Sequence, residues 1–228
     1  MPRKPRMYLP GIPSHVVQRG NDRNPCFFEE ENYLFFLDFL KDACRRYEVV
    51  VHAYVLMTNH IHLLMTPSTE SGISRVMQLL GNRYVQYINK KYRKTGTLWE
   101  GRHKASLIDA EQYLLTCYRY IEMNPVRANM VDHPGDYRWS SYQYHATGSP
   151  TSIVKDHEVF LRIASTPEER MYRYRELFRT GLDARDVHDV RKAVAFSVPL
   201  GNDLFKERIE ATLGKSVGYI SRGRPKLG

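Results

Sequence analysis

Two histidines, His60 and His62, stand at the start of an apolar segment that follows the polar pair Thr58 and Asn59. Successive side chains of a β-strand point to opposite faces, so residues two apart share a face. On a strand, the two imidazoles would therefore point to the same place, where they could hold a metal ion. The chain has nine histidines, however, and a His-x-His pair alone also fits two structural core residues. The pair becomes informative only if other reactive groups converge on it.

A second set of candidate residues lies on a segment with helical periodicity. Tyr113, Cys117, Tyr120 and Asn124 follow one another at three- and four-residue spacing, which places them on one helix face. A tyrosine can act as a nucleophile on a phosphodiester whose charge a metal neutralises, and an amide oxygen can serve as a metal ligand. The structural alternative is strong, because the chain has sixteen tyrosines and most tyrosines are core or surface residues.

Positive charge is concentrated between residues 72 and 104. This segment has eight basic residues and one acidic residue, Glu100, in a chain whose formal net charge is +9. Cations that bind phosphates, interleaved with flat rings that stack on unpaired bases, are what a single-stranded nucleic acid requires. A solvated helix face is the alternative interpretation. The basic candidates are Arg75, Arg83, Lys90, Lys91, Arg93, Lys94, Arg102 and Lys104, and the aromatic ones are Tyr84, Tyr87, Tyr92 and Trp99.

Composition limits the class of protein. Hydrophobic residues make up 42% of the 228 residues, enough for one substantial domain and an appendage, and no apolar run is long enough to cross a membrane. The first residues carry charge without an apolar segment behind them, so we expect no signal peptide and a cytoplasmic, nucleoid-associated protein. Three cysteines without CxxC spacing argue against a disulfide framework or a thiolate zinc site.

The periodicity of the first 125 residues predicts alternating strands and helices. Their order, βαββαβ followed by a helix, is typical of the ferredoxin-like α+β fold, an antiparallel sheet with two helices on one face. The nearly continuous apolar run at 49–57 predicts a strand that is buried on both faces or central in the sheet. Asp109 and Gln112 resemble a capping box that opens the third helix, which Pro125 would terminate. The predicted strands are 14–19, 49–57, 60–66 and 104–108, and the first two helices are 29–47 and a segment from 71 to about 93.

Beyond residue 147 these patterns stop at a Gly-Ser-Pro segment that is typical of a boundary. The remainder, 148–228, is expected to be a mostly helical extension, with short helices within 156–196 and a capped amphipathic helix at 202–213. Arg222 and Arg224 flank a glycine in a tail similar to an AT-hook, which would lie in the minor groove of A·T tracts. A frayed basic terminus is the equal alternative.

Four motifs that occur in this order carry a resemblance to a known family. They are His60-Ile61-His62, Leu98-Trp99-Glu100-Gly101-Arg102, the segment from Tyr118 to Ala128, and Trp139-Ser140-Ser141-Tyr142. Together they resemble the single-tyrosine HUH transposases, and more closely the REP-associated tyrosine transposases, over residues 8–145. The resemblance implies a ferredoxin-like nuclease domain within 1–147 that nicks and rejoins single-stranded DNA. It also implies hairpin-bearing repetitive palindromic elements as substrate, with the 5′ end kept on a tyrosine and a free 3′ hydroxyl.

The same resemblance implies roles for individual residues. His60 and His62 match the metal-binding histidines, Tyr120 matches the nucleophile, and Asn124 matches a metal-site position at which the family commonly has glutamine or another polar residue. It implies Mg²⁺ or Mn²⁺, although imidazole by itself gives a site no preference for magnesium. The sequence identifies no general base, because Glu122 projects from another part of the helix and is expected to be an exposed surface residue.

Two other functions stay open on the sequence alone. One is a non-catalytic DNA-binding regulator that keeps the fold and its basic face, and the other is a metal-dependent nuclease that uses water in place of Tyr120. A single tyrosine indicates two active sites for a full strand exchange and so favours a homodimer, whereas members of the closer branch can act as monomers. The oligomeric state, the DNA target and the position of the cut are therefore not predicted.

Overall fold

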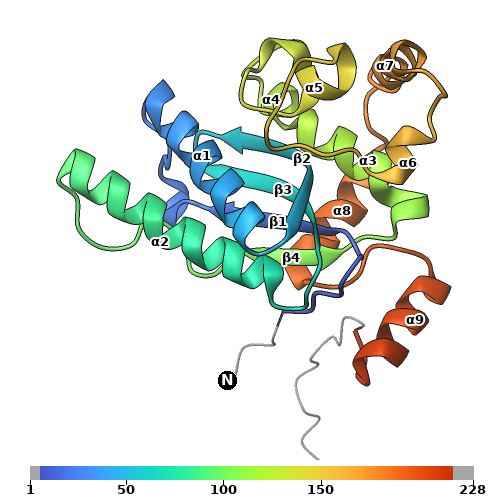
Figure 1. Cartoon of the computed structure of the whole chain (residues 1–228), viewed down its shortest axis with the longest axis horizontal. Coiled ribbons are helices and arrows are strands. Elements are labelled where there is room, and N and C mark those ends of the chain that lie inside the picture. The colour runs from blue at the N-terminus through green and yellow to red at the C-terminus, as the bar shows by residue number, and fades with distance from the viewer. Residues whose placement is uncertain (1–5, 218–228) are drawn as a thin grey trace, which may run out of the picture.

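A four-stranded antiparallel sheet lies at the centre of the chain, of which this computed structural model describes residues 6–217 (Figure 1). The strand order is β2-β3-β1-β4, and all neighbours are antiparallel. With two helices that connect β1 to β2 and β3 to β4, this is the ferredoxin-like arrangement predicted from the sequence. The strands and connecting helices are β1 (Ser14–Arg19), α1 (Glu30–Arg46), β2 (Val49–Met57), β3 (His60–Pro67), α2 (Gly72–Tyr92) and β4 (Lys104–Leu107).

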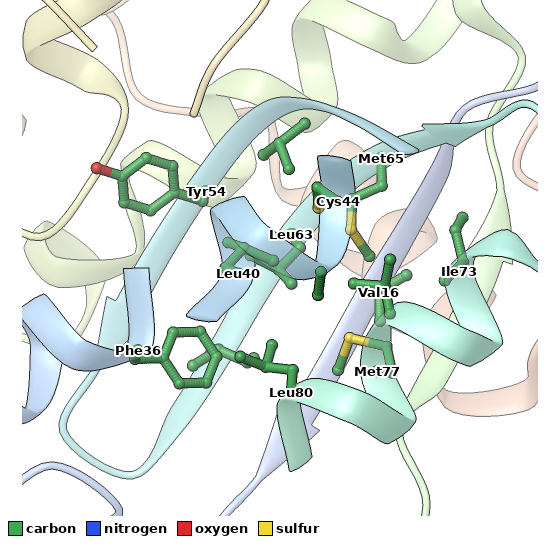
Figure 2. Packing of buried hydrophobic residues seen from close by; sticks show 14 of the residues in the cluster. Val16, Phe36, Leu40, Cys44, Tyr54, Leu63, Met65, Ile73, Met77 and Leu80 are labelled. Atoms are coloured by element: carbon green, nitrogen blue, oxygen red, sulfur yellow. The ribbon is translucent and has the colours of Figure 1, made fainter. Parts of the chain in front are cut away.

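Helices α1 and α2 cover one face of the sheet (Figure 1). Phe36 and Leu40 of α1 and Leu80 of α2 pack with Leu63 of β3 in one cluster of buried side chains between the helices and the sheet (Figure 2). Each of these side chains is almost completely buried, which stabilises the fold by about 1.5–3 kcal/mol per side chain. The apolar stripes that predicted the two helices are therefore the surfaces that hold them on the sheet.

The opposite face of the sheet is covered as well, by α3 (Ala110–Glu122) and by helices of the C-terminal extension (Figure 1). Val55 and Leu64 of the sheet share one apolar cluster with Ile121 of α3 and Val190 of α8 (Ala184–Phe196). The predicted helical extension thus forms a second layer of the molecule. The sheet lies between two helical layers, and the site described below lies on the α3 side.

Strand β2 is buried on both faces, as its continuous apolar sequence predicted, but it lies at an edge of the sheet and not at its centre. Two later segments cover this edge. The amide of Leu56 donates to the Trp139 carbonyl at 2.9 Å, and the amide of Lys155 donates to the Val51 carbonyl at 2.9 Å. Paired in this way, the edge offers few free backbone groups to another chain.

The start of α3 differs from the prediction, and its end agrees with it. Asp109 is the N-cap residue, but its side chain makes no capping hydrogen bond, so the predicted capping box is not formed. The third helix ends at Glu122, before Pro125, as predicted, and a separate short helix, α4 (Asn124–Arg127), follows after one residue, Met123. A proline is tolerated in the first turn of a helix, where its missing N–H would have no partner anyway. The break turns the chain and presents α4 beside the end of α3.

The extension contains the helices that its sequence predicted. Three helices lie within 156–196, and the side chain of Asn202 caps α9 by accepting the amide of Phe205 at 2.7 Å. The boundary at residue 147 stays a prediction. Across residues 6–217, every helix is too short or too polar to cross a membrane. The remaining elements are η1 (Asn21–Arg23), η2 (Pro134–Asp136), α5 (Tyr142–Thr147), α6 (Glu158–Leu161), α7 (Pro167–Glu176) and α9 (Asp203–Leu213).

Candidate active site

A cavity of about 560 Å³ lies between the sheet and the helices α3, α4 and α8. It brings together His60 and His62 from β3, Tyr120 from α3 and Asn124 from α4. The structure thus unites four residues that the sequence singled out for chemistry. Strand alternation places the two histidines on one face, and the single-residue break after α3 keeps Asn124 on the same side as Tyr120.

Each of the two histidines makes a hydrogen bond through its Nδ1 atom. Their ring centroids are 5.1 Å apart. Nδ1 of His60 contacts Oδ1 of Asn59 at 2.7 Å, and Nδ1 of His62 contacts Nε2 of His15 at 2.8 Å. In the tautomer in which Nδ1–H of His62 donates to His15, the Nε2 lone pair of His62 is free to bind a metal. His15, on β1, is a positioning residue that the sequence analysis did not identify.

These imidazoles are kept neutral by their surroundings. Burial lowers the pKa of His60 to about 4, with the charge of Arg19 adding to the shift and a side-chain hydrogen bond with Asn124 opposing it. Burial also lowers the pKa of His62 well below its usual value and that of His15 to about 3. Neutral imidazole is the form that binds metal ions, so no proton has to leave the site near neutral pH.

Tyr120 is in contact with a histidine pair on one side and an arginine on the other. Its ring meets those of His15 and His62 edge-on, at centroid distances of 5.7 and 5.8 Å. The guanidinium carbon of Arg127 lies 4.1 Å from the Tyr120 ring centroid. Burial lowers the pKa of Arg127, and Tyr120 opposes that shift. Nε and Nη1 of Arg127 are buried without a hydrogen-bond partner, which marks them as donors available to an anion.

The donor set fits a divalent cation that is shared with a substrate. Nδ2 of Asn124 donates to the Tyr120 carbonyl at 3.0 Å, which leaves its side-chain oxygen as a ligand. Within residues 6–217 no group of three or more His, Cys, Asp or Glu side chains could hold a metal. Two imidazoles and one amide oxygen would fill only part of a coordination shell, and the other positions would be open to phosphate oxygens or water.

The cavity is strongly basic. Among the described residues that line it, five are cationic and one, Glu100, is acidic. Arg102 and Lys104 were predicted to bind nucleic acid, and both line the cavity. Three cations were missed, Arg19, Arg127 and Arg191. Of these, Arg19 could have been found, because strand alternation places it on the face of His15.

Comparison with known proteins assigns a family. The model described as IS200-like transposase matches residues 10–124, which is half of the chain. The chain belongs to the IS200-like transposase family. A Haemophilus influenzae protein described as a REP-associated tyrosine transposase is 27% identical over 118 residues, 47% of this chain and 66% of the relative. The match thus spans just under two thirds of that relative.

A solved structure has the same fold. It is described as a REP-associated tyrosine transposase bound to a REP hairpin, and it has a TM-score of 0.56 at 17% identity. The match covers 69% of this chain and 93% of that structure. The resemblance to single-tyrosine transposases, first drawn from the sequence motifs, is confirmed by the family model and by both relatives.

The other predicted DNA contacts among the described residues lie outside the cavity. Several basic side chains of α2 are engaged with α1 or the segment before it. Lys91 pairs with Glu29 at 2.6 Å, and Arg83 pairs with Asp42 at 3.7 Å. The ammonium of Lys94 lies 4.2 Å from the centroid of the Phe28 ring, so it is directed toward that side too. The assignments of Arg75, Arg83, Lys90, Lys91, Arg93 and Lys94 to DNA stay predictions, and Arg222 and Arg224 lie outside the described residues.

Two predicted aromatic residues are core residues. Tyr84 is completely buried, and its hydroxyl donates to the Cys26 carbonyl at 2.7 Å. The ring of Trp99 is 8% exposed and packs against Tyr84 and Phe36. Neither ring therefore has a free face on which a base could stack. Trp99 still lines a cavity, which is described below.

Glu122 is not the exposed residue that the sequence suggested. It is completely buried, and its carboxylate accepts three hydrogen bonds from the second helical layer. The donors are Ser141 Oγ at 2.5 Å, His145 Nδ1 at 2.7 Å and Tyr174 Oη at 2.6 Å. Two positions after Tyr120, this network fixes the last turn of the helix that carries the tyrosine.

Proposed function

We propose that this transposase cuts and rejoins single-stranded DNA beside a hairpin, through a covalent bond between Tyr120 and a 5′ phosphate. One observation carries the proposal: a tyrosine, two neutral imidazoles and a guanidinium with two unpartnered nitrogens line one basic cavity. A hairpin substrate is supported by the relative and the solved structure, both described as REP-associated tyrosine transposases, the latter bound to a REP hairpin.

Cleavage follows from the chemistry of the tyrosine. The Tyr120 oxygen attacks phosphorus and loses its proton, and the bond from phosphorus to the 3′ oxygen breaks as that oxygen takes up a proton. The phosphotyrosine keeps the energy of the broken bond, so a 3′ hydroxyl can later attack it and restore a phosphodiester. Arg127 stands over the ring, where its two free N–H groups can donate to the phosphate oxygens as negative charge develops.

The remaining residues of the cavity bind and orient the DNA. His60, His62 and Asn124 would hold a divalent cation, Mg²⁺ or Mn²⁺, which when bound supplies positive charge to a non-bridging phosphate oxygen. The hydrogen bond that Nδ1–H of His62 donates to His15 fixes the ring of His62. Arg102 and other cations of the wall neutralise the neighbouring phosphates, which makes DNA affinity fall as salt rises.

The test uses a labelled single strand that carries a hairpin, incubated with Mn²⁺ or Mg²⁺ and resolved on a denaturing gel. We expect wild type to form a covalent protein–DNA adduct and Tyr120→Phe to form none. Tyr113→Phe is the matched control, because Tyr113 lies on the same helix but does not line the cavity. It should form the adduct at the wild-type rate.

The same gel separates the alternatives. If wild type binds the hairpin but never cuts it with either metal, the chain is a DNA-binding regulator. If Tyr120→Phe still cuts and releases phosphate ends without an adduct, water is the nucleophile. Either outcome would overturn the proposal.

A further inference from the structure

A second cavity, of about 690 Å³, lies between α2 and the segment 97–103. The proposed chemistry does not use it. Arg102 lines both this cavity and the one that holds Tyr120, so the segment 97–103 forms a wall shared by the two. A strand whose phosphate lies beside Tyr120 would therefore pass close to the second cavity.

The α2 side of this cavity is a row of uncharged hydrogen-bonding residues. Ser74, Gln78, Asn82 and Gln86 are each four positions apart, so they follow one side of the helix, and all four line the cavity. Gln18 adds another amide from β1, and its Nε2 donates to the Gly101 carbonyl at 3.0 Å. Amide side chains both donate and accept, which suits the edge of a polar ring better than a phosphate.

Gly81 lines the same cavity, and neither its backbone conformation nor a steric clash requires glycine at this position. It is in the interior of α2, where its backbone does not have a positive φ, and glycine there is less favourable than alanine. A Cβ atom at this position would meet only Nε1 of Trp99, at 4.0 Å. The position thus has room for a small side chain beside the indole, and a glycine there keeps the backbone of α2 accessible at the cavity wall.

The indole of Trp99 adds a donor without a partner. The residue is 8% exposed, and its Nε1–H is buried with no hydrogen bond. Buried N–H groups are normally paired, so an unpaired one that lines a cavity marks a position for an acceptor atom. This nitrogen lies 4.0 Å from the position that a Cβ atom of residue 81 would occupy.

We infer that this cavity binds one unpaired nucleobase of the single strand that Tyr120 cuts, and that it thereby reads sequence near the cut. A cavity takes an extruded or unpaired base, whereas bases in a duplex are read by an element that enters a groove. Asn82 and its neighbours would contact the base edge, Trp99 Nε1 would donate to a ring acceptor, and Arg102 would bind the phosphate between the two cavities. This inference rests on the proposed function for the choice of strand.

The test is selection by binding, so that it does not depend on cleavage. The full chain carrying Tyr120→Phe is incubated with a pool of hairpins flanked by a randomised single-stranded segment, and bound DNA is sequenced. We expect one position of the segment to prefer a particular base by roughly tenfold, the discrimination typical of paired hydrogen bonds to a base edge. Adding Gly81→Leu, which fills the space over the helix, should abolish the preference at that position only.

Two further variants make the result specific. Asn82→Ala should weaken or change the same preference, since it removes an amide and leaves the cavity open. Gly181→Leu is the matched control, because Gly181 also has open space and lies outside both cavities. It should retain the wild-type preference.

The inference is overturned if no position shows a base preference, or if Gly81→Leu keeps the preference of its parent. Failure of the proposed function looks different. A wild-type chain that selects a base but forms no adduct with the selected strand would leave the base-binding cavity supported and the tyrosine chemistry wrong.

Discussion

Replacing Arg127 with methionine should slow DNA cleavage without destabilising the fold. The guanidinium lies 4.1 Å from the Tyr120 ring centroid, and two of its nitrogens are buried without partners. A hydrogen bond to a charged group contributes about 1.5–3 kcal/mol, so two bonds to a phosphate would contribute about 3 kcal/mol or more. Because about 1.4 kcal/mol corresponds to a tenfold change in rate, Arg127→Met should reduce the rate about 100-fold.

Arg127→Met should make the fold more stable, although it slows cleavage. A buried donor without a partner costs about 1–3 kcal/mol, and methionine keeps an unbranched stem while removing those donors. Since Arg127 is not fully buried, we expect only about 1 kcal/mol of added stability. Arg127→Lys keeps the charge without the planar fork and should cleave at an intermediate rate, about tenfold below wild type.

The assay is the single-turnover rate of adduct formation, with urea denaturation of the same samples. Arg191→Met is the control, because Arg191 lines the same cavity but is exposed, and it should slow the reaction only a few-fold. The reasoning is refuted if Arg127→Met forms adduct at the wild-type rate. It is also refuted if the variant loses both rate and stability, since Arg127 would then be a structural residue.

Three further changes test the surroundings of the site. His15→Phe removes the hydrogen bond to His62 and should lower the affinity for Mn²⁺ about 10- to 100-fold in titration calorimetry, because such bonds orient a metal ligand. Glu122→Gln should lower the free energy of unfolding in urea by about 2–3 kcal/mol, since it leaves buried donors poorly paired. Burial lowers the pKa of His52 to about 4, so between pH 6.5 and about 4 the unfolded chain binds a proton that the folded chain does not. The free energy of unfolding should therefore decrease as the pH is lowered from 6.5 to about 4, by about 1.4 kcal/mol per pH unit for this group. His52→Gln should make this dependence on pH less steep.

For each of these three predictions, one result would contradict the reasoning. An unchanged Mn²⁺ affinity in His15→Phe would mean that the ring of His62 needs no support. For Glu122, Glu111→Gln is the comparison, because its ion pair with Arg162 is exposed and should contribute less than about 1 kcal/mol. An acid slope that is identical in wild type and His52→Gln would show that His52 does not titrate differently in the two states.

The parts of the site that could be predicted from the sequence are those set by local geometry. His60 and His62 share a face because strand side chains alternate, and this holds wherever the strand lies in the sheet. Tyr120 and Asn124 are one helical turn apart, and the break at Met123 is too short to separate them. The three- and four-residue spacing of apolar side chains in α1 and α2 likewise predicted both the helices and the faces that they bury.

The parts that were missed depend on contacts between distant segments. His15 meets His62 only because β1 pairs with β3, across 47 residues of sequence. The later segments that cover the edge strand β2 could not be predicted from its own sequence either, because a covered edge strand has the same apolar sequence as a central one. Trp99 was expected to offer a ring face for bases, but the packing of α1 and α2 covers that face.

The contacts of Glu122 link the helix that carries Tyr120 to the C-terminal extension. Tyr120 and Glu122 are two residues apart and point to different sides of α3, one into the cavity and the other into a buried network. That network includes Tyr174, on a helix that lies beyond the predicted boundary at residue 147. On the cavity side, Arg191 of α8 forms part of the wall that faces the tyrosine. The extension therefore supports α3 on the side away from the cavity and also forms part of the cavity wall, so the geometry at Tyr120 depends on a segment that carries none of the family motifs.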